Sequence, residues 1–235
     1  MKKLLLVITG IILLITHSCK TATKNRDTDC AFVLIDVTDS FNEAISLNTI
    51  LPLLRLSQDS LYGAKVTISP ITNLRFNHSK SISIPSENMM EHNEFDRKRA
   101  LQAFKAKIDS CLHNLNNGVR GTDGSYIFFA MANALNDLTG CKECDTKTLI
   151  LYSDCRENSK LFDSYDKESI KYIQKYPERI IALLDKNWPI EKSLEGVRIY
   201  IEHHPTSTVE DDIFFIMSRF MQSYYQAKGA TVLIN

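Results

Sequence analysis

The stretch from Cys30 to Ser40, CAFVLIDVTDS, begins the folded part of this 235-residue chain and points to its fold. The run Ala31 to Ile35 is apolar without a break, as expected of a central parallel strand that is buried on both faces. It ends on Asp36, and Thr38 and Ser40 follow at alternate positions. A carboxylate and two hydroxyls on one side of a tight turn offer the oxygen ligands that a hard cation prefers. The stretch therefore predicts a buried strand with a candidate cation site at its end.

Short β-rich runs alternate with longer helical patterns along the rest of the chain. This alternation predicts an α/β fold with a doubly wound, mostly parallel sheet and helices on both faces, similar to a Rossmann sheet. Further strands are expected at 64–71, 81–85, 148–152, 197–201 and 231–234, the second of them at an edge. Helices are expected at 96–115, at 125–138 and between Ser207 and Gly229. The segment 158–195 is harder to assign: 170–176 has a helical pattern, and 180–184 fits a helix or a strand.

Two further polar clusters occur where such a sheet places its loops. One is GTDGS at 121–125, just before the expected helix, and the other is Ser153-Asp154, directly after the strand 148–152. Ligands of open α/β sheets bind beyond the carboxyl ends of the strands, so we expect both clusters to lie near Asp36. A purely structural alternative is that the polar residues after Ile35 cap the first helix.

Together the three clusters resemble the metal-ion-dependent adhesion site of von Willebrand factor A domains. In that family a DxSxS motif, a distant Thr and a later Asp converge on one magnesium ion, and the resemblance covers most of residues 30–235. It implies that Asp36, Thr38 and Ser40 fill the first motif and that Asp154 fills the last position.

Two residues are candidates for the middle ligand of this site. Ser125 has the better spacing to the following helix, whereas Gly121-Thr122 looks like the family's Gly-Thr, so we favour Ser125 and keep Thr122 as the alternative. Asp39 and Cys155 stand where the family often has glycine, and neither change removes a ligand.

The resemblance also implies a mode of binding. One metal position stays open, and an acidic side chain from a partner protein occupies it, so that binding requires the cation. Mg²⁺ suits a site with few direct protein ligands because it usually keeps several waters, and Ca²⁺ and Mn²⁺ are alternatives. A metal-independent structural module in an envelope complex is the main alternative function.

The N-terminus resembles the signal of a bacterial lipoprotein. Lys2 and Lys3 precede an apolar run at 4–15, which is too short to span a bilayer, and Thr-His-Ser leads to Cys19. We predict a signal peptide at 1–18, a lipid anchor (palmitate class) on Cys19 with a tether at 19–29, and the domain at 30–235. The protein would then lie in the bacterial cell envelope, anchored to a membrane and facing the periplasm. Ordinary secretory cleavage is the alternative.

The charge and the cysteine content argue against nucleic-acid binding and against a zinc site. Loss of the two lysines with the signal leaves 26 basic against 28 acidic residues, which argues against binding nucleic acid. Five cysteines follow Cys19, namely Cys30, Cys111, Cys141, Cys144 and Cys155, and their pairing cannot be read from the sequence. Cys141 and Cys144 have metal-knuckle spacing, but no second pair completes a zinc site.

Catalytic motifs are missing from the sequence, so we do not expect an enzyme. There is no GxSxG, GxxxxGK or HExxH pattern. Asp36 after a strand is similar to the nucleophile of haloacid dehalogenase-like phosphatases, but the general acid of that family would have to stand where Thr38 is.

Overall fold

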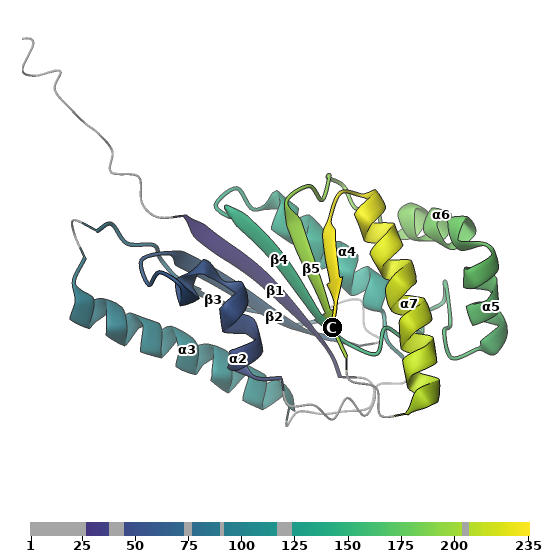
Figure 1. Cartoon of the computed structure of the whole chain (residues 1–235), viewed down its shortest axis with the longest axis horizontal. Coiled ribbons are helices and arrows are strands. Elements are labelled where there is room, and N and C mark those ends of the chain that lie inside the picture. Colours follow the sequence, from purple (N-terminus) through teal and green to yellow (C-terminus); the bar gives the residue numbers. More distant parts are fainter. Residues whose placement is uncertain (1–26, 38–44, 73–76, 90–91, 117–123, 204–206) are drawn as a thin grey trace, which may run out of the picture.

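The computed structural model describes residues 27–37, 45–72, 77–89, 92–116, 124–203 and 207–235, which build a six-stranded sheet between two layers of helices (Figure 1). The strand order is β3-β2-β1-β4-β5-β6, and every neighbouring pair is parallel except β2 and β3. This confirms the doubly wound, mostly parallel α/β sheet. The strands are β1 (Thr28–Asp36), β2 (Gly63–Ile71), β3 (Lys80–Ile84), β4 (Thr146–Tyr152), β5 (Val197–Glu202) and β6 (Thr231–Ile234).

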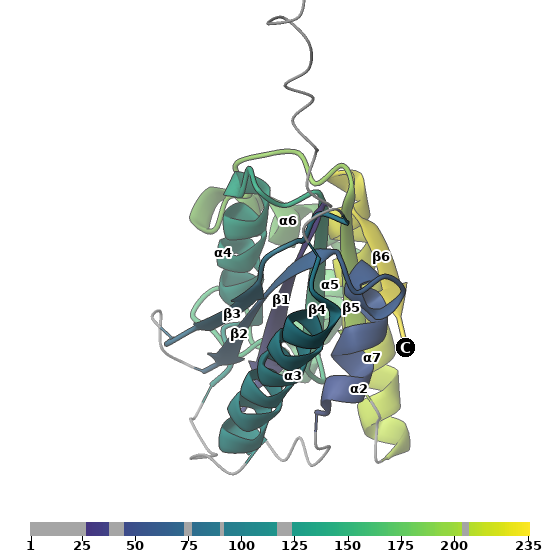
Figure 2. The ribbon, with the colours of Figure 1, turned by 90° about the vertical axis from the view of Figure 1, so that its left-hand side faces the viewer.

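Helices cover both faces of the sheet, and Figure 2 shows α3 and α4 on opposite sides of β1. Alternation along β1 explains this arrangement, because successive side chains of a strand point to opposite faces. Val33 and Ile35 pack with the α2 and α3 layer, whereas Phe32 and Leu34 pack with the layer of α4 to α7. The helices are α2 (Leu47–Ile50), α3 (Glu94–Asn116), α4 (Ile127–Gly140), α5 (Lys167–Lys175), α6 (Pro177–Asn187) and α7 (Thr208–Ala227), with 3-10 turns η1 (Leu51–Leu53) and η2 (Arg55–Ser57).

Several element boundaries differ from the sequence expectations. The first strand begins at Thr28 rather than Ala31, because its polar start pairs with β2 and β4 on both sides. The ambiguous 180–184 segment lies in helix α6, and the short turns at 47–57 were not expected. The start of α7 agrees with its capping pattern, since the Ser207 side chain accepts a hydrogen bond from the Glu210 N–H. Among the described residues, no helix is both long and apolar enough to cross a membrane.

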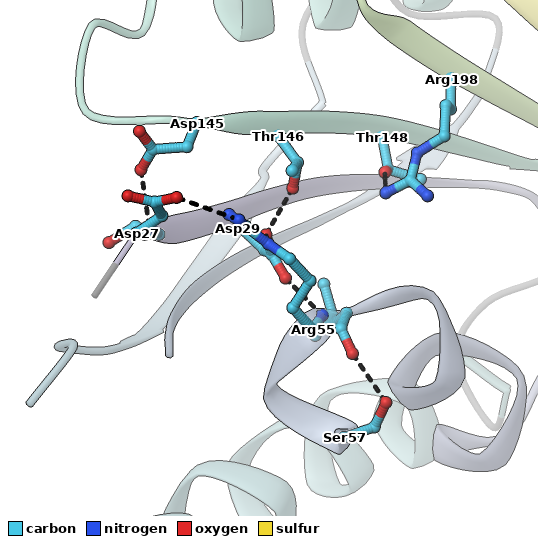
Figure 3. A network of polar contacts seen from close by, with 10 residues as sticks. Asp27, Asp29, Arg55, Ser57, Asp145, Thr146, Thr148 and Arg198 are labelled. Atoms are coloured by element: carbon cyan, nitrogen blue, oxygen red, sulfur yellow. Dashed lines mark hydrogen bonds and ion pairs between the residues drawn. The ribbon is translucent and has the colours of Figure 1, made fainter. Parts of the chain in front are cut away.

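Polar contacts, drawn in Figure 3, and a disulfide fix the amino end of β1. The buried Asp29 carboxylate accepts hydrogen bonds from the Arg55 backbone N–H, from Arg55 Nε at 2.7 Å and from the Thr146 hydroxyl. The next residue, Cys30, forms a disulfide with Cys144, which precedes β4. These contacts hold β1 to the η2 turn and to β4 at the end of the sheet opposite Asp36.

Candidate metal centre

Asp36 is the last residue of β1, the strand at which the strand order of the sheet reverses. From β1 the chain passes to β2 on one side and later returns to β4 on the other, so the carboxyl ends of β1 and β4 form the switch point of the sheet. The register brings Ile35 opposite Tyr152 of β4, and Asp36 opposite Ile71 of β2. A switch point is where open α/β sheets bind their ligands.

Two serine hydroxyls converge on one oxygen of the Asp36 carboxylate. Ser125 Oγ and Ser153 Oγ each donate a hydrogen bond to Asp36 Oδ2 at 2.9 Å, although the serines lie 89 and 117 residues away in the sequence. All three side chains are buried. A hydroxyl that donates its proton still has lone pairs to offer, so this cluster has the hard oxygen donors that fit a divalent cation such as Mg²⁺.

Backbone contacts on both sides hold Ser125 in place. The Tyr126 N–H donates to the Thr72 carbonyl just beyond β2, and the Asn158 N–H donates to the Ser125 carbonyl from the loop after β4. Tyr126 has a non-helical backbone conformation and precedes α4, so Ser125 lies outside the helix that was expected to include it. The serine therefore bridges the ends of β2 and β4 beside Asp36.

The loop after β4 contains an unusual backbone conformation at Cys155. Its φ of 62° lies in the left-handed region that favours glycine, and its side chain is fully buried. The Cys155 N–H donates to Ser153 Oγ at 3.0 Å, and the Arg156 N–H donates to Asp154 Oδ1 at 2.9 Å. Burial, together with the nearby Asp154 and Asp36 carboxylates, raises the pKa of the Cys155 thiol well above its usual value. A thiol with this pKa stays protonated and neutral beside the acidic cluster.

Glu157 anchors the same loop to the start of α4. Its buried carboxylate accepts a hydrogen bond from the Phe128 N–H at 3.0 Å, in the first turn of the helix. Burial raises the pKa of this carboxyl from 4.5 to about 8, against the lowering effect of its hydrogen bonds. The Ser164 N–H and hydroxyl both donate to the Glu157 carbonyl, so the loop is also tied to the segment before α5.

The structure thus brings part of the proposed ligand set together. Asp36 and Ser125 are in direct contact, and Asp154 directly follows Ser153. Thr38, Ser40 and the alternative Thr122 lie outside the described residues, as does Cys19. Sequence reasoning singled out Asp154 in the Ser-Asp pair but missed the contact of Ser153 with Asp36. The signal was the position of Ser153 immediately after a buried strand, which places its hydroxyl at the same sheet edge as Asp36.

Comparisons with known proteins give no family. No protein-family model and no curated protein matches the chain. Two crystal structures of the pilus adhesin SpaC from Lactobacillus rhamnosus GG, one in an open conformation, match 90% of this chain, with 12% sequence identity and a TM-score of 0.41. The chain spans 28% and 29% of the length of the adhesin chain in the two structures.

Proposed function

We propose that this protein is a non-enzymatic binding module that holds a divalent cation at the end of β1 and uses it to bind a partner protein. The cation would be bound by Asp36, Thr38, Ser40, Ser125 and Asp154, with Thr122 as the alternative to Ser125. An acidic side chain of the partner would complete the coordination. The observation that carries the proposal is the convergence of two buried hydroxyls on the Asp36 carboxylate.

The position of the cluster supports a ligand-binding role over simple helix capping. The N-cap residue of α4 is Tyr126, which makes no side-chain cap hydrogen bond, and Ser153 lies in the loop after β4. The two serine hydroxyls instead donate to the Asp36 carboxylate from loops that are separate in the sequence. Cys155, next to Asp154, adopts the left-handed conformation at a cost of about 1–2 kcal/mol. Backbone strain of this kind clusters at functional sites, because elsewhere a less strained loop would serve.

The chemistry of the cluster favours a hard cation. Its described members offer only carboxylate and hydroxyl oxygens, which suit Mg²⁺, Ca²⁺ or Mn²⁺ better than softer metals. Among these ions we favour Mg²⁺, because a site with few direct protein ligands leaves room for waters and for a partner carboxylate.

A thermal melt in EDTA, Mg²⁺, Ca²⁺ or Mn²⁺ tests the cation site. A ligand at about a hundred times its Kd stabilises the native state by about 2.7 kcal/mol, which raises the Tm of a domain of this size by roughly 5–10 °C. Asp36→Ala should abolish this rise, and Asp36→Asn should do so with less change in packing. Asp109→Asn, which removes an exposed carboxylate from α3, is the matched control and should keep the rise.

Peptide binding separates the two parts of the proposal, which are the cation site and the recognition of an acidic partner. A short peptide rich in Asp and Glu should bind in Mg²⁺ but not in EDTA, and its Asn and Gln counterpart should not bind. If no cation shifts the Tm of the wild-type protein at millimolar concentration, the cation site is wrong. A cation shift without any binding of acidic peptides would reject only the mode of partner recognition.

We also propose that the module is a lipoprotein of the bacterial cell envelope, anchored through Cys19 and facing the periplasm. The Cys30–Cys144 disulfide supports a location outside the cytoplasm, where disulfides form and persist. The polar stretch 20–26, which directly precedes the described residues, would serve as the link to the membrane.

A further inference from the structure

Three cysteines gather at the amino end of the sheet, opposite the candidate metal centre. Cys30 and Cys144 form the disulfide, and Cys141 is a free thiol. The three sulfur atoms all lie within 4.8 Å of one another. A sulfur therefore has to move by only about 3 Å to exchange partners, because a disulfide bond is about 2 Å long.

The three cysteines differ in exposure. Cys30 and Cys144 are buried, whereas Cys141 is half-buried at the end of α4. All three line a cavity of about 470 Å³ beside the last turns of α4. On the sheet side its lining includes the polar Lys65 and Thr67 of β2 together with residues 30–32 of β1. A reagent that enters from solvent therefore meets Cys141 more readily than either sulfur of the buried pair.

We propose that Cys141 is the entry thiol of a three-cysteine relay that forms the Cys30–Cys144 disulfide. The reduced protein reacts with a small-molecule or protein disulfide: the Cys141 thiolate attacks one of its sulfurs, a mixed disulfide forms, and one outside thiolate leaves. The Cys144 thiolate then attacks Cys141 Sγ, which forms the Cys141–Cys144 bond and releases the second outside thiolate.

An internal exchange completes the relay without another oxidant. The Cys30 thiolate attacks Cys144 Sγ, the Cys30–Cys144 bond forms, and Cys141 leaves as a thiolate that takes up the proton lost by Cys30. The two electrons removed from Cys30 and Cys144 reside on the two thiols of the outside reagent. Cys141 ends as a free thiol, as the structure has it.

The chain is well suited to mapping this relay with trypsin. Lys142 separates Cys141 from Cys144, so the three cysteines fall on three tryptic peptides, 27–55, 121–142 and 143–147. Fully reduced protein would be mixed with oxidised glutathione and quenched with acid and N-ethylmaleimide at successive times. We expect glutathione on 121–142 first, then a link between 121–142 and 143–147, and finally a link between 27–55 and 143–147.

Variants give the rate test. Cys141→Ala should form the Cys30–Cys144 disulfide about tenfold more slowly than wild type, because oxidation must then begin at a buried thiol. Cys111→Ala, which removes a buried thiol from α3, is the matched control and should oxidise at the wild-type rate. Cys141→Ser replaces the alanine variant if circular dichroism shows that the latter does not fold.

Two results would overturn the relay. One is an equal oxidation rate for wild type and the Cys141 variant, with no link between 121–142 and 143–147 at any time. The other is tight binding of Zn²⁺ by the reduced protein through all three sulfurs, which protects wild type from oxidation and would mark the cluster as a metal site.

Discussion

Glu157 provides a direct test of how the loop after β4 is held. Its carboxyl is buried against the first turn of α4 and has its pKa raised from 4.5 to about 8, mainly by burial. The folded protein therefore prefers the neutral acid. The stability that this preference gives is fully present below about pH 4.5 and is lost as the pH rises through about 8. Glu157→Gln fixes a neutral side chain that can still accept from the Phe128 N–H.

The size of the effect follows from the same two pKa values. Each pKa unit corresponds to about 1.4 kcal/mol, so between pH 5 and pH 8 the wild-type free energy of unfolding should fall by roughly 3–4 kcal/mol because of this group alone. The glutamine variant lacks that loss. Its pH dependence should therefore be weaker by this amount, which corresponds to about 10 °C in Tm for a chain of this length.

Urea unfolding of both proteins at pH 5 and pH 8 measures the difference, and all other titrating groups cancel in the comparison. Glu168→Gln is the matched control, because Glu168 lies at a helix start, in the first turn of α5, but its side chain is 77% exposed. Parallel stability curves for wild type and Glu157→Gln would refute the reasoning and would mean that Glu157 is ionised or solvated in the folded protein.

Two further predictions concern the α3 layer and the anchor. Arg97 is buried and donates to three backbone carbonyls, so Arg97→Ala should cost about 3–5 kcal/mol of stability in urea unfolding, whereas the exposed Arg99→Ala should change it by less than about 0.5 kcal/mol. Equal costs would contradict a structural role for the buried guanidinium. Cys19→Ala should move the protein from the membrane fraction to the soluble fraction, and an unchanged membrane fraction would reject the lipid anchor.

Most of the fold could be predicted because hydrophobic patterning reports directly on burial. The run Ala31 to Ile35 is buried on both faces of the sheet, and the Ser207 cap and Gly229 mark the ends of the last helix. The turns at 47–57 could not be predicted in the same way. Their shape depends on long-range contacts, such as the Asp29 carboxylate that accepts from the Arg55 N–H, and no local pattern encodes such a partner.

The candidate site was predictable to the extent that strand ends locate it. The expected proximity of Asp36 and Ser125 agrees with their hydrogen bond, while their role as cation ligands stays a prediction. The part played by Ser153 depends on the turn that follows β4. That turn requires a left-handed residue, and the only sign of it in the sequence is that Cys155 stands where the resembled family often has glycine, because cysteine itself does not favour this conformation. A left-handed backbone conformation is hard to predict from the sequence when a residue other than glycine adopts it.

The proposed cation site and the three-cysteine cluster lie at opposite ends of strand β1. Cys30 lies near its start and Asp36 at its end, and six residues of extended strand span about 20 Å. The hydrogen bonds to Asp36 come from Ser125 and Ser153 at the carboxyl edge, whereas the disulfide and the Asp29 contacts lie at the amino edge. Reduction of the disulfide should therefore lower the Tm with and without Mg²⁺ by similar amounts. A cation shift that disappears on reduction would mean that the amino end of β1 also controls the geometry around Asp36.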